Sequence, residues 1–151
     1  MGEEDLIDFV VKAKKETYAS GKGKISVRIP GSKEMHYAEG HYEYIDMYFG
    51  DLAFNGIETV FDASKPVWGM VYSGAVLNEY QDVSALYSFL KKCLFLIQRE
   101  APFRGPKYYD QDEYVYSNDF SGDIHHFIGY ERIDMDGETI YELHYSGGDI
   151  L

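Results

Sequence analysis

The sequence predicts an α+β fold in which two helices cover one face of an antiparallel sheet. Three observations lead to this prediction: two segments with apolar residues at helical spacing, strand-like alternation after each of them, and the same element order in both halves. Each half, about residues 1–78 and 79–151, is predicted to hold one helix followed by three strands. The length of 151 residues suits a single domain with a sizeable core.

Both predicted helices carry one apolar stripe. In the first, over residues 5–18, the apolar side chains recur at helical spacing as Leu6, Phe9, Val10 and Ala13. The second covers residues 83–98 and begins after Asp82, a residue type that caps helix N-termini. Cys93 lies beside its stripe, which favours a buried core thiol over a nucleophile.

The strands are predicted from alternating patterns and turn signals. Ala63-Ser64-Lys65-Pro66 and Asp136-Gly137 mark two hairpin turns. The connection at residues 20–33 is expected to be extended, and its alternating Ile25, Val27 and Ile29 form a candidate edge strand. The predicted strands cover residues 42–49, 58–62, 66–73, 113–120, 124–134 and 138–146.

A shift of 73 residues aligns parts of the two halves. Gly56-x-Glu58 then matches Gly129-x-Glu131, and Tyr72 matches Tyr145. We interpret this pattern as a degenerate internal duplication. The alternative is a chance likeness between two hairpins that both end in small residues.

The charge balance narrows the possible partners. The 26 Asp and Glu residues exceed the 14 Lys and Arg residues, so the net charge is −12. Such a field repels nucleic acids and anionic membranes, whereas cationic small molecules and basic proteins suit it; solubility alone is an equally good explanation. The acidic start, the single cysteine and the lack of a membrane-spanning apolar run predict a cytoplasmic protein.

The alternation within the strands predicts which side chains face the helices. The most uniformly apolar positions of the two last hairpin strands are expected beneath the helices. They are Trp68, Met70, Tyr72, Tyr141, Leu143 and Tyr145. By the same reasoning Ile45, Met47 and Phe49 are assigned to the core.

The uncovered face is then predicted to bind a ligand. Tyrosine rings and carboxylates on one surface suit a cationic or aromatic small molecule, although they also suit a solvent-exposed amphipathic face. The candidate ligand-binding residues are Tyr42, Tyr44, Asp46, Tyr48, Tyr114, Tyr116, Glu142 and His144.

No motif identifies an enzyme: P-loop, dinucleotide-binding, zinc-protease and serine-hydrolase patterns are absent. Glu58 and Glu131 are possible acid/base residues, because neighbouring carboxylates perturb each other's pKa; pairing with a lysine is the structural alternative. Asp123, His125 and His126 make a poor metal site, since adjacent strand residues point to opposite faces. No metal or cofactor is expected.

Several motifs resemble those of an uncharacterised prokaryotic family, the domain of unknown function DUF5680. The resemblance spans residues 6–150 and implies no established activity. At the level of architecture alone, the duplicated plan is similar to gyrase-inhibitor-like effector-binding domains, which bind amphipathic and often cationic compounds. The motifs are Tyr44-Ile45-Asp46-x-Tyr48-Phe49-Gly50, Lys65-Pro66-Val67-Trp68-x-Met70-x-Tyr72-Ser73-Gly74, Pro102-Phe103-Arg104-Gly105-Pro106, Gly129-Tyr130-Glu131 and Gly147-Gly148-Asp149-Ile150.

Together these patterns favour a non-catalytic, effector-like domain that binds a cationic or aromatic small molecule. One alternative is an interaction module for a basic partner, such as a regulator or a toxin. The other is a carboxylate-dependent hydrolase that uses Glu58 or Glu131.

Overall fold

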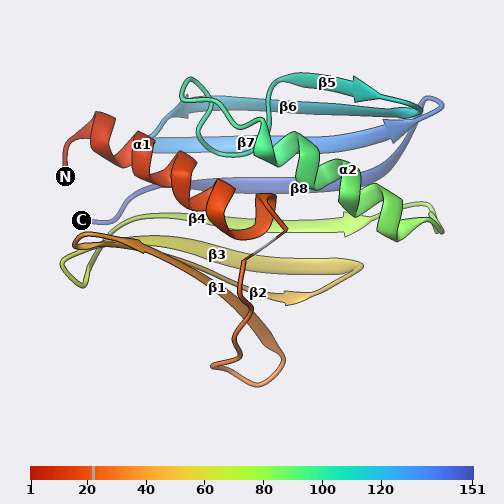
Figure 1. The fold of residues 1–151 in the computed structure, drawn as a ribbon. Coiled ribbons are helices and arrows are strands. Elements are labelled where there is room, and N and C mark those ends of the chain that lie inside the picture. Colours follow the sequence, from red (N-terminus) through yellow and green to blue (C-terminus); the bar gives the residue numbers. More distant parts are fainter. Residues whose placement is uncertain (22) are drawn as a thin grey trace.

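The computed structural model describes residues 1–21 and 23–151, and it has an α+β fold with two helices and one open antiparallel sheet (Figure 1). Position 22, within the predicted connection 20–33, lies outside the described residues. The elements are α1 (Glu3–Lys14), a π-helical turn η1 (Lys15–Ala19), β1 (Ser32–Glu39), β2 (Tyr42–Gly50), β3 (Ala53–Asp62), β4 (Lys65–Val76), α2 (Val83–Phe95), β5 (Tyr108–Gln111), β6 (Tyr114–Asp123), β7 (His126–Met135) and β8 (Glu138–Asp149).

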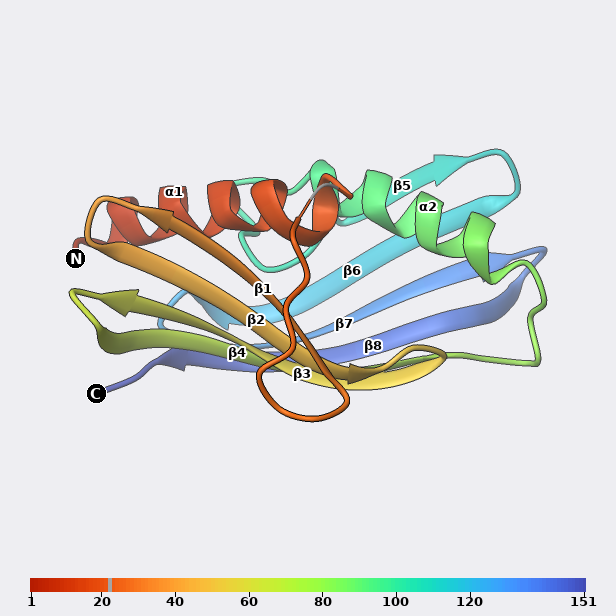
Figure 2. The same ribbon diagram turned by 60° about the horizontal axis from the view of Figure 1, so that its bottom comes forward.

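The sheet consists of two four-stranded meanders that meet in the middle. The strand order is β1-β2-β3-β4-β8-β7-β6-β5, and every neighbouring pair is antiparallel. In both ribbon views α1 and α2 follow one another along the same side of the sheet, with the core between (Figures 1 and 2). No helix in the described part of the chain has the length and apolarity needed to cross a bilayer.

The two predicted helices are present, with adjusted ends. The stripe of α1 is buried, and basic residues near its C-terminus complement the helix dipole. The α2 helix begins after Asp82, whose side chain accepts a hydrogen bond from the Ala85 N–H at 3.2 Å, as an N-cap does.

The prediction of three strands in each half was wrong, because each helix is followed by four. The missed strands β1 and β5 lie at the two edges of the sheet, where one partner suffices and charged or polar residues are tolerated. The expected strand at Ile25–Ile29 is reduced to a bridge between Ser26 and Glu34. Both predicted hairpins are confirmed, with positive φ angles at Ala63, Ser64 and Asp136. The first turn is shorter than predicted, because Lys65 and Pro66 already pair with β3 as part of β4.

The face assignment was correct for β4 and β8 but wrong for β2. All six predicted positions on β4 and β8 are buried in the core cluster. Met47, in contrast, pairs in register with Ile57, which in turn pairs with Val71. Ile57 and Val71 are 40% and 50% exposed, so Met47 points with them to the face away from the helices. Ile45 and Phe49 share the parity of Met47, so the assignment of all three to the core is wrong.

Two glycines allow tyrosines to lie flat beneath the helices. Gly56 pairs with Tyr72, and Gly129 pairs with Tyr145, on neighbouring strands. A Cβ atom at either glycine would collide with the end of the facing tyrosine ring. The Gly-x-Glu pattern therefore has a packing cause: the glycine makes room for a ring, and the glutamate two residues later points to the same side.

We expect Gly129→Ala to destabilise the fold by about 1–3 kcal/mol, since the added methyl group must push the Tyr145 ring out of a closely packed core. Urea denaturation measures the change. Ile128→Ala is the matched control, because that neighbouring side chain is 63% exposed, and it should stay within about 0.5 kcal/mol of the wild type. Equal effects of the two substitutions would contradict the packing role of the glycine.

Candidate ligand-binding pocket

A cavity of about 230 Å³ lies between the helices and the first half of the sheet. Its walls come from the end of α1, from η1 and α2, from strands β1 to β4, from Tyr141 of β8 and from the segment after α2. Its floor contains three buried polar side chains, Tyr44, Asp46 and Glu58.

The floor is built from two carboxylates on neighbouring strands. Asp46 and Glu58 are directly paired across β2 and β3 and are only 7% and 2% exposed. A buried carboxylate requires hydrogen bonds to offset its lost hydration. Tyr72 donates its hydroxyl hydrogen to Asp46 Oδ1 at 2.6 Å, and Tyr44 donates to Glu58 Oε1.

Lys14 joins the floor to the rest of the fold. Its Nζ lies 2.8 Å from Glu58 Oε1 and donates to the Phe103 carbonyl oxygen at 2.6 Å. Burial lowers the pKa of Lys14, and the attraction of Glu58 opposes that shift. One ammonium group thus ties the end of α1 both to β3 and to the segment after α2.

Asp46 is the titratable group at the centre of the pocket. Burial, followed by repulsion from Glu58, raises the pKa of Asp46 to about 7, while the hydrogen bond from Tyr72 acts in the opposite direction. The carboxyl group therefore changes its charge near neutral pH. A cation placed beside it would favour the ionised form.

The upper walls are aromatic and the rim is charged. The half-buried rings of Tyr48, Phe54 and Tyr87 line the cavity. Lys33 and Lys91 stand at the rim, where Nζ of Lys33 lies 5.7 Å from the ring centroid of Tyr48. The pocket therefore has buried hydrogen-bond acceptors at its floor, aromatic rings along its walls and the half-buried lysines at its rim.

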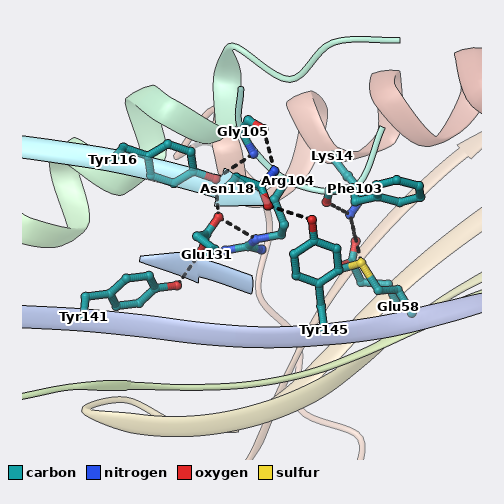
Figure 3. A network of polar contacts seen from close by, with 11 residues as sticks. Lys14, Glu58, Phe103, Arg104, Gly105, Tyr116, Asn118, Glu131, Tyr141 and Tyr145 are labelled. Carbon is teal, nitrogen blue, oxygen red and sulfur yellow. Dashed lines mark hydrogen bonds and ion pairs between the residues drawn. The ribbon is translucent and has the colours of Figure 1, made fainter. Parts of the chain in front are cut away.

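The second half of the sheet holds a related but closed network (Figure 3). Glu131 is fully buried and accepts hydrogen bonds from Arg104 Nε at 3.0 Å, from Arg104 Nη2 at 2.8 Å, and from the hydroxyls of Tyr116 and Tyr141. The backbone N–H of Gly105 donates to the Tyr116 hydroxyl at 2.9 Å. Every carboxylate oxygen in this network thus has donors from the chain itself.

Asn118 completes the closed network. Its side-chain amide donates to the Gly105 carbonyl at 2.8 Å, and its oxygen accepts from the Tyr145 hydroxyl at 2.7 Å. Asn118 pairs with Glu131 across β6 and β7, as Asp46 pairs with Glu58 across β2 and β3.

The structure brings some predicted site residues together and separates others. Tyr44, Asp46, Tyr48 and Glu58 line the pocket. Tyr116 and Glu131 belong to the closed network. Outside both lie Tyr42 and Tyr114, whose rings pack against the helix residues Phe9 and Phe89, and Glu142 and His144, which alternate with the buried residues of β8.

The prediction that these tyrosines occupy the uncovered face was wrong for β2 and β6. Tyr44 and Tyr116 are buried in the core, and Tyr42, Tyr48 and Tyr114 pack against it. Asp46 shares their parity and is buried with them. A tyrosine with its hydroxyl bound to a buried carboxylate serves as a core residue, so polarity alone misassigned the face.

Sequence reasoning missed the cations of the site. Lys14 follows Val10 and Ala13 at helical spacing, so it extends the apolar stripe of α1. This position in the stripe could have indicated that Lys14 is buried. Arg104 stands within the Pro102–Pro106 motif, but its inward direction is set by contacts with Glu131.

Other candidate chemistry has structural partners. Asp123 Oδ1 accepts from the backbone N–H groups of His125 and His126, and the His125 ring pairs with Glu3 and Asp149. Burial raises the pKa of the Cys93 thiol, which keeps it protonated. Across residues 1–21 and 23–151, no group of three His, Cys, Asp or Glu side chains is arranged to hold a metal ion.

Comparison with known proteins identifies a family but no activity. Residues 46–150 match the model of the family described as Domain of unknown function (DUF5680), so the chain belongs to that family. No curated protein and no solved structure matches the chain.

Replacing Arg104 tests the closed network. Arg104→Met is expected to destabilise the protein by about 3–5 kcal/mol, because it leaves the buried Glu131 charge without its cation. Adding Glu131→Gln to Arg104→Met should recover part of this loss, and urea denaturation of both variants measures it. A double variant no more stable than Arg104→Met would refute the role of the ion pair.

Asp46 makes stability depend on pH. Because the folded-state pKa of about 7 exceeds the ordinary value of 3.8, the neutral carboxyl contributes stability that is fully present below pH 4 and is lost as the pH rises through 7. Asp46→Asn should therefore stabilise the protein by roughly 1–3 kcal/mol more at pH 8 than at pH 5. Urea denaturation at both values checks this, and a constant difference would count against a raised pKa.

Proposed function

We propose that this DUF5680 member is an effector-like domain that binds a small cationic or aromatic molecule in the pocket between its helices and its sheet. The observation that carries the proposal is the pairing of two buried carboxylates, Asp46 and Glu58, at the floor of a cavity with aromatic walls. Burying two acids side by side costs stability, which a bound cation would offset.

The size and the lining of the pocket support a small ligand. Its volume of about 230 Å³ lies below the roughly 300–1,000 Å³ typical of sites for drug-sized molecules. The rings of Tyr48, Phe54 and Tyr87 provide flat surfaces for an aromatic body or for a cation over a ring face. The net charge of −12 favours the approach of cations over that of anions.

We further propose that the two halves derive from an internal duplication in which each helix covers its own half. Gly50 and Gly122 both have φ angles of +94°, and the register shifts after Val60 and after Ile133 lie at positions 73 residues apart. The strand pairing of β4 with β8 places Tyr72 opposite Tyr145, its counterpart in the repeat. In this interpretation one copy keeps an open site and the other has filled it.

A screen by thermal shift tests the binding function. We expect several lipophilic cations to raise the melting temperature of the wild type by a few degrees, since binding to the native state alone stabilises it. Tyr44→Phe and Asp46→Asn should reduce these shifts, because both change the floor of the pocket.

Tyr130→Phe is the matched control for Tyr44→Phe. The Tyr130 hydroxyl donates to Glu142 outside the pocket, so this variant should keep the shifts of the wild type. A screen in which no cationic or aromatic compound stabilises the wild type would reject the proposed function. Shifts that persist in both pocket variants would place the binding site elsewhere.

A further inference from the structure

The closed network of the second half shows what the pocket of the first half lacks. Tyr116 and Tyr44 both donate to a buried glutamate, and Tyr145 and Tyr72 both donate to the residue paired with that glutamate. In the second half the segment after α2 returns over the sheet, so that Arg104 and Gly105 reach these groups. In the first half the segment at residues 23–31 lies along the β1 edge of the sheet, where Ser26 pairs with Glu34, and none of its residues lines the pocket (Figure 1).

Three acceptors on the floor therefore stay open. Within the described part of the chain, hydrogen bonds reach Asp46 through Oδ1 and Glu58 through Oε1, whereas Oδ2 and Oε2 have none. The Tyr44 hydroxyl donates but accepts no hydrogen bond from residues 1–21 or 23–151, unlike that of Tyr116. No fully buried side-chain oxygen or nitrogen of the described residues lacks a partner, so the open oxygens of Asp46 and Glu58 must border accessible space, which the pocket provides.

Asp46 in the first half and Asn118 in the second half occupy corresponding positions but require opposite hydrogen-bonding partners. Asn118 offers an N–H group and meets a backbone carbonyl, that of Gly105. Asp46 in its ionised form offers only acceptor oxygens, so its partner must be a donor. The protein's own backbone carbonyl is the wrong partner there, and a ligand with N–H groups is the right one.

We propose that the pocket binds the amidinium or guanidinium group of an aromatic monocation, which supplies to Glu58 and Asp46 donors of the kind that Arg104 supplies to Glu131 in the second half. This inference rests on the proposed function and names its ligand class. A planar, weakly hydrated group with forked donors suits two carboxylates on adjacent strands, as Arg104 already shows on Glu131. The aromatic part then lies against Tyr48, Phe54 and Tyr87.

The rim limits the ligand to one positive charge. Lys33 and Lys91 are half-buried at the opening and repel a second cationic group, whereas an anionic or neutral tail is tolerated. Lys14 and Arg104 also face the cavity, but the buried carboxylates of Glu58 and Glu131 neutralise them. The open carboxylate oxygens of Asp46 and Glu58 thus remain the attractive end of the pocket.

Isothermal titration calorimetry with three matched compounds tests the inference. Benzamidine carries the amidinium group, benzamide is its neutral isostere and benzoate is its anionic counterpart. We expect benzamidine to bind at least about tenfold more tightly than benzamide, because charge-assisted hydrogen bonds to both carboxylates are lost in the amide. Benzoate should not bind.

Two variants and a control locate the interaction. Asp46→Asn and Glu58→Gln should each weaken benzamidine binding about tenfold or more, and Glu142→Gln, outside the pocket, should leave it unchanged. The wild-type affinity should also rise between pH 6 and pH 8, since the cation requires the ionised carboxylate, and Asp46→Asn should remove this rise. The charged or titratable groups around Asp46 are Lys14, Glu58, Tyr72 and Arg104.

The outcomes separate this inference from the proposed function. Binding of benzamide or benzoate as tightly as benzamidine would overturn the amidinium assignment, while the pocket would still be a binding site. Absence of benzamidine binding would also overturn it, and the broader screen would then decide the proposed function alone. If circular dichroism shows that Glu58→Gln does not fold, Asp46→Asn decides the result. The asparagine removes a buried charge, whereas Glu58→Gln leaves the buried Lys14 without its anionic partner.

Discussion

The burial of carboxylates beneath the helices is the constraint on which the rest of this structure depends. Asp46, Glu58 and Glu131 lie in a layer where water is scarce, so the chain itself must supply their donors. Phenol hydroxyls do this from other strands of the same sheet, and an ammonium and a guanidinium group supply further donors. Tyr44, Tyr72, Tyr116 and Tyr141 suit this arrangement, since tyrosine combines core packing with a donor at its tip.

The two halves solve the same problem in different ways. Around Glu131 the segment after α2 turns inward, and Arg104 meets the carboxylate with two parallel N–H groups. Around Glu58 a single lysine suffices for one oxygen, and the neighbouring cavity remains. The path of the segment after α2, which brings Arg104 and Gly105 over the second half, therefore decides that the cavity lies in the first half. The Gly-x-Glu pattern is common to both, because each half must also lay a tyrosine flat over a glycine.

Sequence patterns predicted the helices, the hairpins and the buried parity of β4 and β8, because these rest on local periodicity and turn chemistry. The same patterns did not predict β1 and β5, because strands at the edge of a sheet do not require a regular alternation of apolar side chains. They also failed for the faces of β2 and β6, where tyrosines count as polar by type but act as core residues. Four pocket residues, Tyr44, Asp46, Tyr48 and Glu58, were nevertheless among the candidates. Their cationic partners depend on contacts between distant segments, which no local pattern reveals.

Asp46 is the residue that supports the proposed ligand site most strongly. The second half shows that asparagine fits the equivalent place, with both ends of its amide hydrogen-bonded and no charge to bury. Aspartate there costs stability at neutral pH, because burial and Glu58 oppose its ionisation. Natural proteins break such local rules mainly at functional sites. The proposed ligand would account for a residue that lowers stability at neutral pH and keeps one oxygen without a donor in the described part of the chain.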